Sequence, residues 1–308
     1  MTVIGVDIGG TKALAVAMDD GRIVAEQRSV LDRSTPTIDA LIGAIDEVAE
    51  GPIDAIGVGV AGLVRVADGV FVWGPHVPGT EIPIRSLLAA RYEVPIVVDN
   101  DANVAALAEF TTGAGVGYRN GLLVTLGTGI GGAIVIDGSV YRGESFAGEW
   151  GHVRVAEGGL LCDCGKRGCW ETRASGPALA RLAREVIAAN PDGSLAGSLQ
   201  GSEVIGETIV AAADAGEETA RALVAEVGRA FGNGLSDLIA IFDPEIVIVG
   251  GGLGSVGESI VGPARRIVVD SVHGGNLRVP PTIQVASLGP SAGAIGAAMA
   301  AADLARVG

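Results

Sequence analysis

The sequence predicts an α/β protein built from two related halves. Short apolar strands alternate with amphipathic helices along most of the 308 residues, as in proteins whose helices pack on sheets. The order of strand, glycine turn, strand and Asp-Gly hairpin in IGVDIGGTKALAVAMDDGRIV returns in LLVTLGTGIGGAIVIDGSVY, which indicates a diverged duplication. A domain usually has roughly 100 to 200 residues, so the length also favours two domains.

The first half is expected to begin with an antiparallel meander. VIGVDI and ALAVAM form two strands around the turn GGTK, and IVAEQ follows the hairpin signal Asp20-Gly21. A helix is predicted to start at Thr35 and Pro36, with apolar residues on one face at Ile38, Leu41, Ile42, Ile45 and Val48. IDAIGVGV and VPIVVD are almost wholly apolar, which is typical of strands covered on both faces. A helix over 102–111 follows the second of them.

The second half continues the alternation of strands and helices. Helices are expected over 177–189 and from about 217 to 241, and EIVIVG is expected to form a strand. The alanine-rich helix 291–306 could pack on either lobe, and we assign it to the first. The predicted lobes are therefore 1–112, joined by helix 291–306, and 113–290, with the crossing in GAGVGY.

Composition argues against several functions. The chain has 21 basic and 36 acidic residues, a net charge of −15, which disfavours nucleic acid and anionic membranes as partners. The uncharged stretch 120–136 is too short to cross a bilayer. No basic segment precedes an apolar run at the N-terminus, so we expect a cytoplasmic protein. Three cysteines within eight residues indicate a metal site instead of a disulfide framework.

Two glycine and threonine turns predict a phosphate-binding site. DIGGTK (residues 7–12) and LGTGIGG (126–132) each place backbone N–H groups and a hydroxyl at the end of a strand. Either turn alone is compatible with an ordinary hairpin, but the duplicated pair favours phosphates. Asp7 is suited to hold Mg²⁺ through water. A third run, GGGLG at 250–254, would let flat backbone approach a purine.

Polar residues crowd the junction between a strand and a helix in VVDNDANVAA. Asp99, Asn100, Asp101 and Asn103 lie where ligands gather in open α/β sheets, beyond the carboxyl ends of the strands. One of them could cap the helix, but four exceed that need. A carboxylate here could accept the proton of an attacking hydroxyl during phosphoryl transfer.

The segment 149–171 predicts a zinc-binding loop. One histidine and three thiolates complete the closed tetrahedral shell of a structural zinc site, and the ligands are His152, Cys162, Cys164 and Cys169. Glu149 and Glu171 bracket the histidine. They are either solvated surface residues or acceptors for paired sugar hydroxyls, and the neighbouring Trp150 and Trp170 favour the second reading.

Taken together, DIGGTK, DNDANVAA, LGTGIGGAIVIDG, EWGH with CDCGKRGCWE, and FDPEIVIVGGGL resemble the ROK family of sugar kinases over nearly the whole chain. The resemblance implies a two-lobed, actin-like ATPase fold of the hexokinase and ribonuclease H type, which closes over ATP and sugar. It implies that Asp101 is the catalytic base. The implied sugar contacts are Asn100, Asp101, Glu149, His152 and Glu171. The implied phosphate and nucleotide contacts are Asp7, Gly9, Gly10, Thr11, Lys12, Thr128 and Gly129, with Gly251 and Gly252 near adenine.

The motif order is most like that of bacterial zinc-containing glucokinases. This implies ATP-dependent phosphorylation of the 6-hydroxyl of glucose with Mg²⁺, a structural Zn²⁺, and a homodimer or homotetramer. His76 and Ala61 stand where many relatives have asparagine and proline, so a kinase for N-acetylmannosamine or N-acetylglucosamine is an alternative. A non-catalytic sugar sensor and a zinc-module interaction protein are the alternatives outside the enzyme class. Relatives that use polyphosphate generally lack the cysteine cluster, which favours ATP as the donor.

Overall fold

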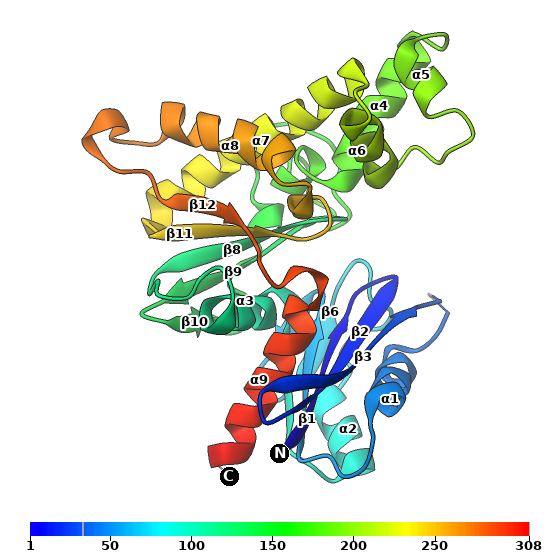
Figure 1. Ribbon diagram of the computed structural model, residues 1–308, viewed down its shortest axis with the longest axis vertical. Helices are drawn as coiled ribbons and strands as arrows, with labels where there is room; N and C mark the ends of the chain where they lie inside the picture. The colour runs from blue at the N-terminus through cyan, green and yellow to red at the C-terminus, as the bar shows by residue number, and fades with distance from the viewer. Residues whose placement is uncertain (33, 308) are drawn as a thin grey trace. The chain divides into compact units, whose positions relative to one another are not determined.

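The computed structural model describes residues 1–32 and 34–307 and divides into two compact units (Figure 1). Unit 1 comprises residues 1–119, 133–148 and 287–308, and unit 2 comprises 120–132 and 149–286. These ranges differ from the expected lobes, because the chain changes units four times and residues 133–148 fall in unit 1. Within that stretch, β10 (Ser139–Tyr141) packs on α3 (Asp101–Thr112) of the same unit.

Unit 1 is built on a five-stranded sheet with the order β3-β2-β1-β4-β7. The first three strands form the predicted antiparallel meander, and β1, β4 and β7 run parallel. Their bounds are β1 Thr2–Ile8, β2 Lys12–Asp19, β3 Arg22–Val30, β4 Ala55–Val60 and β7 Ile96–Asn100. A separate two-stranded ribbon pairs β5 (Leu63–Arg65) with β6 (Val70–Trp73). Every residue of β4 is buried, as its unbroken apolar sequence predicts.

Helices cover both faces of this sheet. α1 (Thr37–Val48) and α2 (Ile84–Tyr92) pack over one apolar core, whereas α9 (Ala292–Val307) packs on a second core formed by other residues of β1, β2 and β4. Pro36 occupies the N-cap of α1 instead of its first turn, so the helix begins one residue after the predicted proline.

The close approach of α9 depends on glycines in the strands beneath it. A Cβ at Gly5 would lie 2.0 Å from the carbonyl oxygen of Ala294, and one at Gly57 would lie 1.8 Å from that of Ala297. No side chain fits between β1 or β4 and the helix backbone, so these two positions require glycine.

The second sheet has the order β10-β9-β8-β11-β12. Its strands are β8 Gly121–Leu126, β9 Ile130–Ile136, β10, β11 Ile246–Gly250 and β12 Thr282–Val285. In both sheets, three strands at one edge form a meander that includes the central strand, β1 or β8. The later strands lie on the other side of that central strand and run parallel to it. This shared order agrees with the predicted duplication.

The helices of unit 2 pack mainly against one long helix, α7 (Glu218–Phe242). The others are α4 Gly176–Ala189, α5 Ser194–Ser198, α6 Gly206–Asp214 and α8 Glu258–Ser271. Gly228 and Gly232 of α7 face α8, and a Cβ at either position would lie 2.7 Å from a carbonyl oxygen of that helix. The residues that the structure describes also form five short 3₁₀ helices, η1 Trp150–His152, η2 Trp170–Thr172, η3 Gly254–Val256, η4 Gly275–Leu277 and η5 Gly289–Ser291. Over the residues described, none of the helices is both long and apolar enough to cross a bilayer.

Candidate functional site

The first glycine turn joins β1 to β2 and leaves its polar groups accessible. The Gly9 N–H donates to the carbonyl oxygen of Lys12 (2.9 Å). Gly10 has no room for a side chain, because a Cβ there would lie 2.6 Å from the Cβ of His76. The side chains of Thr11 and Lys12 are exposed. The turn therefore presents a hydroxyl and an ammonium group together beside glycine backbone, a combination that suits anions.

Two glycines, Gly59 and Gly293, lie close to the side chain of Asp7, next to this turn. A Cβ at Gly293 would lie 2.5 Å from Asp7 Oδ2, and one at Gly59 would lie 3.7 Å from Oδ1 and 3.4 Å from the Cα of Asp101. Burial, reinforced by repulsion from Asp101, raises the pKa of Asp7 to about 8. A cation beside the carboxylate would offset both effects. The carboxylate is a hard oxygen donor, and its chemistry therefore fits the predicted Mg²⁺.

At the junction of β7 and α3, the asparagine does cap the helix. Asn100 Oδ1 accepts hydrogen bonds from the N–H groups of Ala102 (2.9 Å) and Asn103 (3.2 Å). Its amide Nδ2 donates to the carbonyl oxygen of Gly62 (3.1 Å). The structural role that the sequence left open for one of the four polar residues thus belongs to Asn100.

Asp99 is 1% exposed and holds the junction of β7 and α3 together through hydrogen bonds. Its Oδ1 accepts hydrogen bonds from the backbone N–H of Asn100 (2.7 Å) and from Asn103 Nδ2 (2.9 Å). Its Oδ2 accepts a charged hydrogen bond from Arg142 Nε (2.7 Å). Sequence reasoning missed Arg142, because it lies 43 residues away along the chain and no local pattern connects the two residues.

Asp101 is the first residue of α3 and is half-buried. Burial raises the pKa of its carboxyl above the ordinary aspartate value, although hydrogen bonding to the N–H of Ala102 opposes the shift. The sequence alone predicts an aspartate with an ordinary pKa here, since the depth of the group becomes visible only in the fold. A carboxylate with a raised pKa is a better proton acceptor.

The ion pair between Arg142 and Asp99 is expected to stabilise unit 1. Arg142→Gln leaves a buried carboxylate without its cation, so we expect the free energy of unfolding to fall by about 2 kcal/mol. Arg119→Gln is the matched control, because Arg119 pairs with Asp137 at the surface with both side chains more than 70% exposed. Its loss should cost less than about 1 kcal/mol. Urea unfolding followed by circular dichroism measures the free energy of unfolding of both variants. An equal decrease in the two would contradict a stabilising role for the ion pair between Arg142 and Asp99.

The second glycine turn joins β8 to β9 in unit 2. The Gly127 N–H donates to the carbonyl oxygen of Gly129 (3.0 Å), and the side chain of Thr128 is exposed. A Cβ at Gly129 would lie 2.6 Å from Glu171 Oε2, which also accepts a hydrogen bond from the Ile130 N–H (3.4 Å). The structure thus brings this turn against one of the two predicted sugar-binding glutamates.

The third glycine run lies against the same turn. The Leu253 N–H donates to the carbonyl oxygen of Leu126 (2.9 Å). Gly251 has a φ of +81°, and a Cβ there would lie 2.3 Å from that same carbonyl oxygen. The space at Gly252 is open, since a Cβ there would have no neighbour within 4 Å. Exposed glycine backbone therefore adjoins the second turn, and its contact with a purine stays a prediction.

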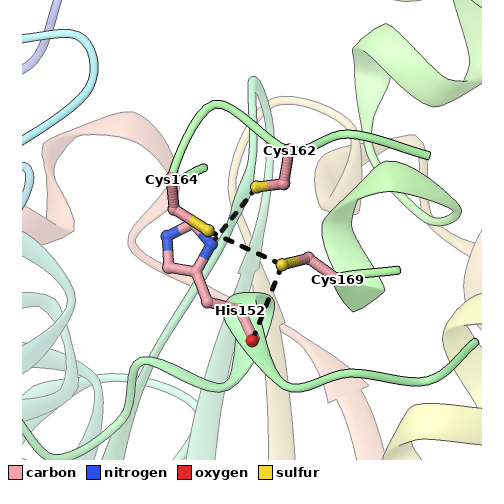
Figure 2. A group of neighbouring side chains, drawn as sticks. All are labelled: His152, Cys162, Cys164 and Cys169. Carbon is pink, nitrogen blue, oxygen red and sulfur yellow. Dashed lines mark hydrogen bonds between the residues drawn. The ribbon is translucent and has the colours of Figure 1, made fainter. Parts of the chain in front are cut away.

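The histidine and the three cysteines of the zinc loop converge on one point (Figure 2). Their ligand atoms all lie within 4.8 Å of one another. Cys164 Sγ is 3.6 Å from Cys169 Sγ, and Cys162 Sγ is 3.6 Å from His152 Nδ1. With Zn–S bonds of about 2.3 Å and Zn–N bonds of about 2.0 Å, a tetrahedral site has ligand separations of about 3.5 to 3.8 Å. The donor set and its spacing therefore fit zinc.

Both predicted glutamates lie beside the histidine of this cluster. Glu171 Oε1 is 3.3 Å from His152 Nδ1 and accepts a hydrogen bond from Cys162 Sγ (2.8 Å). Glu149 Oε2 is 4.0 Å from His152 Nε2. The Nδ1 atom faces the thiols, so the Nε2 atom is left for another partner, as the sequence predicts for a metal-bound imidazole. Glu171 is also the link between the cluster and the second glycine turn.

Both the sequence and the fold of this chain resemble those of known proteins. Residues 3–303 match the model of the ROK family. The chain belongs to the ROK family. A ROK family glucokinase from Streptomyces griseus, solved with glucose and AMPPNP, is 38% identical, and the match covers 98% of this chain and 100% of that one with a TM-score of 0.88. A ROK hexokinase from Thermus thermophilus is 32% identical, with a TM-score of 0.77 and full coverage of both chains.

A glucokinase of Streptomyces coelicolor is 40% identical over 98% of this chain and 97% of its own length. The two solved ROK structures confirm the predicted actin-like ATPase fold. The ROK motif residues fall into two sets. Unit 1 carries Asp7, Gly9, Gly10, Thr11, Lys12, Asn100 and Asp101, and unit 2 carries Thr128, Gly129, Glu149, His152, Glu171, Gly251, Gly252 and the three cysteines.

Proposed function

We propose that this chain is a glucokinase that transfers the γ-phosphoryl group of ATP to the 6-hydroxyl of glucose. The observation that carries the proposal is Asp101, a half-buried carboxylate at the carboxyl end of β7 and the start of α3. The similarity to glucokinases, one of them solved with glucose and AMPPNP, supports the choice of sugar and donor.

Asp101 acts as the general base. Its carboxylate accepts the proton of the 6-hydroxyl while the sugar oxygen bonds to the γ-phosphorus, and the bond from that phosphorus to the bridging oxygen of ADP breaks. The buried side chain of Asp99, its ion pair with Arg142 and the cap by Asn100 hold the start of α3 in place. The base is therefore positioned before substrate arrives.

The hydroxyls of the sugar bind to Asn100, Glu149, His152 and Glu171. Carboxylates suit adjacent hydroxyls because each accepts two hydrogen bonds. His152 Nε2 carries the proton when Nδ1 is metal-bound, so it donates to a sugar oxygen. His152, Cys162, Cys164 and Cys169 would hold a structural zinc ion, which would fix the direction of that donor.

The two glycine turns bind the phosphates of ATP through their N–H groups, with Thr11, Lys12 and Thr128 adding side-chain donors. Asp7 would hold Mg²⁺, which would supply positive charge to the phosphates when bound. Lys12 matters for the same reason, because it is one of only two lysines in a chain of net charge −15. Gly251 and Gly252 would lie near adenine.

An assay of ADP release tests the function directly. Glucose, mannose, N-acetylmannosamine and N-acetylglucosamine are offered in turn with Mg²⁺-ATP, and glucose is expected to give the highest kcat/KM. A higher value for an N-acetylated sugar would move the assignment to that kinase within the family. Sugar binding without ADP release from any of the four would leave a sensor and refute the kinase.

The pH dependence of kcat/KM is expected to show the raised pKa of Asp101. The base must be ionised to accept a proton, so activity falls as the pH falls through its pKa. Because burial raises this pKa, the acid limb should lie above the ordinary aspartate value of about 3.9. Initial rates from pH 4.5 to 9 at saturating Mg²⁺ measure the limb, and a profile flat down to pH 4.5 would contradict this environment for Asp101.

We also propose a homodimer or homotetramer, which sedimentation velocity tests. Because ATP is the proposed co-substrate, we place the enzyme in the cytoplasm.

A further inference from the structure

Unit 2 contains a cavity of about 810 Å³ that none of the proposed sugar, nucleotide or zinc ligands lines. Its walls come from residues 154–160 of the zinc loop, from residues 170–173, and from α4 and α7. Pockets for small molecules usually have volumes of about 300 to 1,000 Å³. The cavity therefore has the volume of a metabolite-binding site, and residues of the zinc loop form one of its walls.

One wall of the cavity is rigid and apolar. Trp170 is 2% exposed, its indole stacks on Phe231 with ring centres 5.5 Å apart, and its Nε1–H donates to the carbonyl oxygen of Ala230 (3.0 Å). A Cβ at Gly234 would lie 2.1 Å from the indole, so glycine is what admits this ring. Val155, Leu160 and Leu182 add further apolar surface.

The charged residues of the lining are mostly cationic. Four arginines from different elements line the cavity, against two acidic residues, Glu226 and Asp237. Arg181 pairs with Glu185 (2.7 Å). The other three, Arg154, Arg173 and Arg229, form no salt bridge with any residue that the structure describes. A net positive lining is unexpected in a chain of net charge −15, and guanidinium groups match the geometry of phosphate oxygens.

We propose that this cavity binds a small organic phosphate monoester. The arginines bind the phosphate group, and the apolar wall around Trp170 packs against the carbon skeleton. The product of the proposed reaction, glucose 6-phosphate, belongs to this class, so the choice of this compound rests on the proposed function.

Occupancy of the cavity is coupled to the sugar site through η2. Trp170 lies between the zinc ligand Cys169 and the proposed sugar contact Glu171, and Arg173 directly follows the same helix. A bound phosphate that pulls the side chain of Arg173 into the cavity therefore shifts η2, the segment that positions Glu171. We expect the ligand to change the KM for glucose more than kcat.

Calorimetric titration of the full chain with glucose 6-phosphate tests the site, at saturating glucose so that the sugar site is filled. We expect one site per chain and weaker binding of inorganic phosphate, which cannot use the apolar wall. Arg173→Ala combined with Arg229→Ala should weaken binding of the ester by about tenfold or more, the loss of about 1.4 kcal/mol. Both side chains are exposed, so the fold should persist. Arg266→Ala, which removes an exposed arginine of α8 outside the cavity, should leave binding unchanged.

Several results would overturn the site. These are no binding to the wild type, binding abolished by saturating glucose, equal affinity in the double variant, or phosphate binding as tightly as the ester. A change in sedimentation coefficient in the double variant would assign the cavity to a contact between subunits and refute the proposal. The titration does not require turnover. Ester binding in a chain that releases no ADP with glucose would therefore refute the proposed function and leave the site standing.

Discussion

Replacing Asp101 by asparagine is expected to lower kcat for glucose phosphorylation by about 10³-fold. General base catalysis contributes about 10² to 10⁴ to a rate, and the amide of asparagine cannot accept the proton. Glucose binding should persist, because Asn100, Glu149, His152 and Glu171 are unchanged. A coupled assay for ADP measures kcat, and calorimetry measures the affinity for glucose.

The matched control for this variant is Asp39→Asn. Asp39 also lies in the first turn of a helix, α1, and is exposed, so the change removes an equivalent charge without touching the junction. Its kcat should equal that of the wild type. Near-normal turnover of Asp101→Asn would refute the role of Asp101 as the base, whereas loss of glucose binding together with turnover would show a role in binding instead.

Replacing Cys164 by serine is expected to remove zinc and weaken glucose binding together. The four ligand atoms lie within 4.8 Å of one another, and a structural zinc site contributes on the order of 10 kcal/mol to local folding. Without the ion, His152 loses its fixed tautomer and the loop that carries Glu171 loses its anchor. Metal analysis by mass spectrometry should find less than one zinc per chain, and the KM for glucose should rise by about tenfold or more.

Asp163→Ser serves as its control, because Asp163 stands between two of the cysteines but is exposed and outside the ligand set. This variant should keep its zinc and its KM. Zinc-free wild-type protein with full activity would refute the coupling between metal and sugar, and so would a Cys164→Ser variant that loses zinc but keeps its KM.

Local patterns in the sequence were enough for the fold class and for the metal cluster. The order of the meander, the buried strand Ala55–Val60 and the helix Glu218–Phe242 were each predicted to within about two residues, because each depends on a periodicity within its own segment. The four residues of the candidate metal cluster could also be predicted, since three of them lie within eight residues and thiolates have few other uses at that spacing.

Interactions between distant segments were not accessible in this way. The partner of Asp99 is Arg142, 43 residues later, and nothing near either residue signals the other. The raised pKa of Asp101 follows from burial that only the folded chain creates. Residues 133–148 were expected in the second lobe because they follow its first strand, yet they pack with unit 1. Such features depend on contacts between residues that are far apart in the sequence, and a single sequence does not show which residues are in contact.

The position of α9 has a consequence for how the chain folds during synthesis. This helix covers β1 and β4 through backbone contacts at Gly5 and Gly57, yet the ribosome makes it almost 290 residues after β1. While unit 2 is translated, the part of this apolar face that α9 covers is therefore exposed to solvent, and only α3 packs beside it. Since exposed apolar surface in a nascent chain favours aggregation, chaperone demand during translation should exceed that of a protein whose first domain closes on itself.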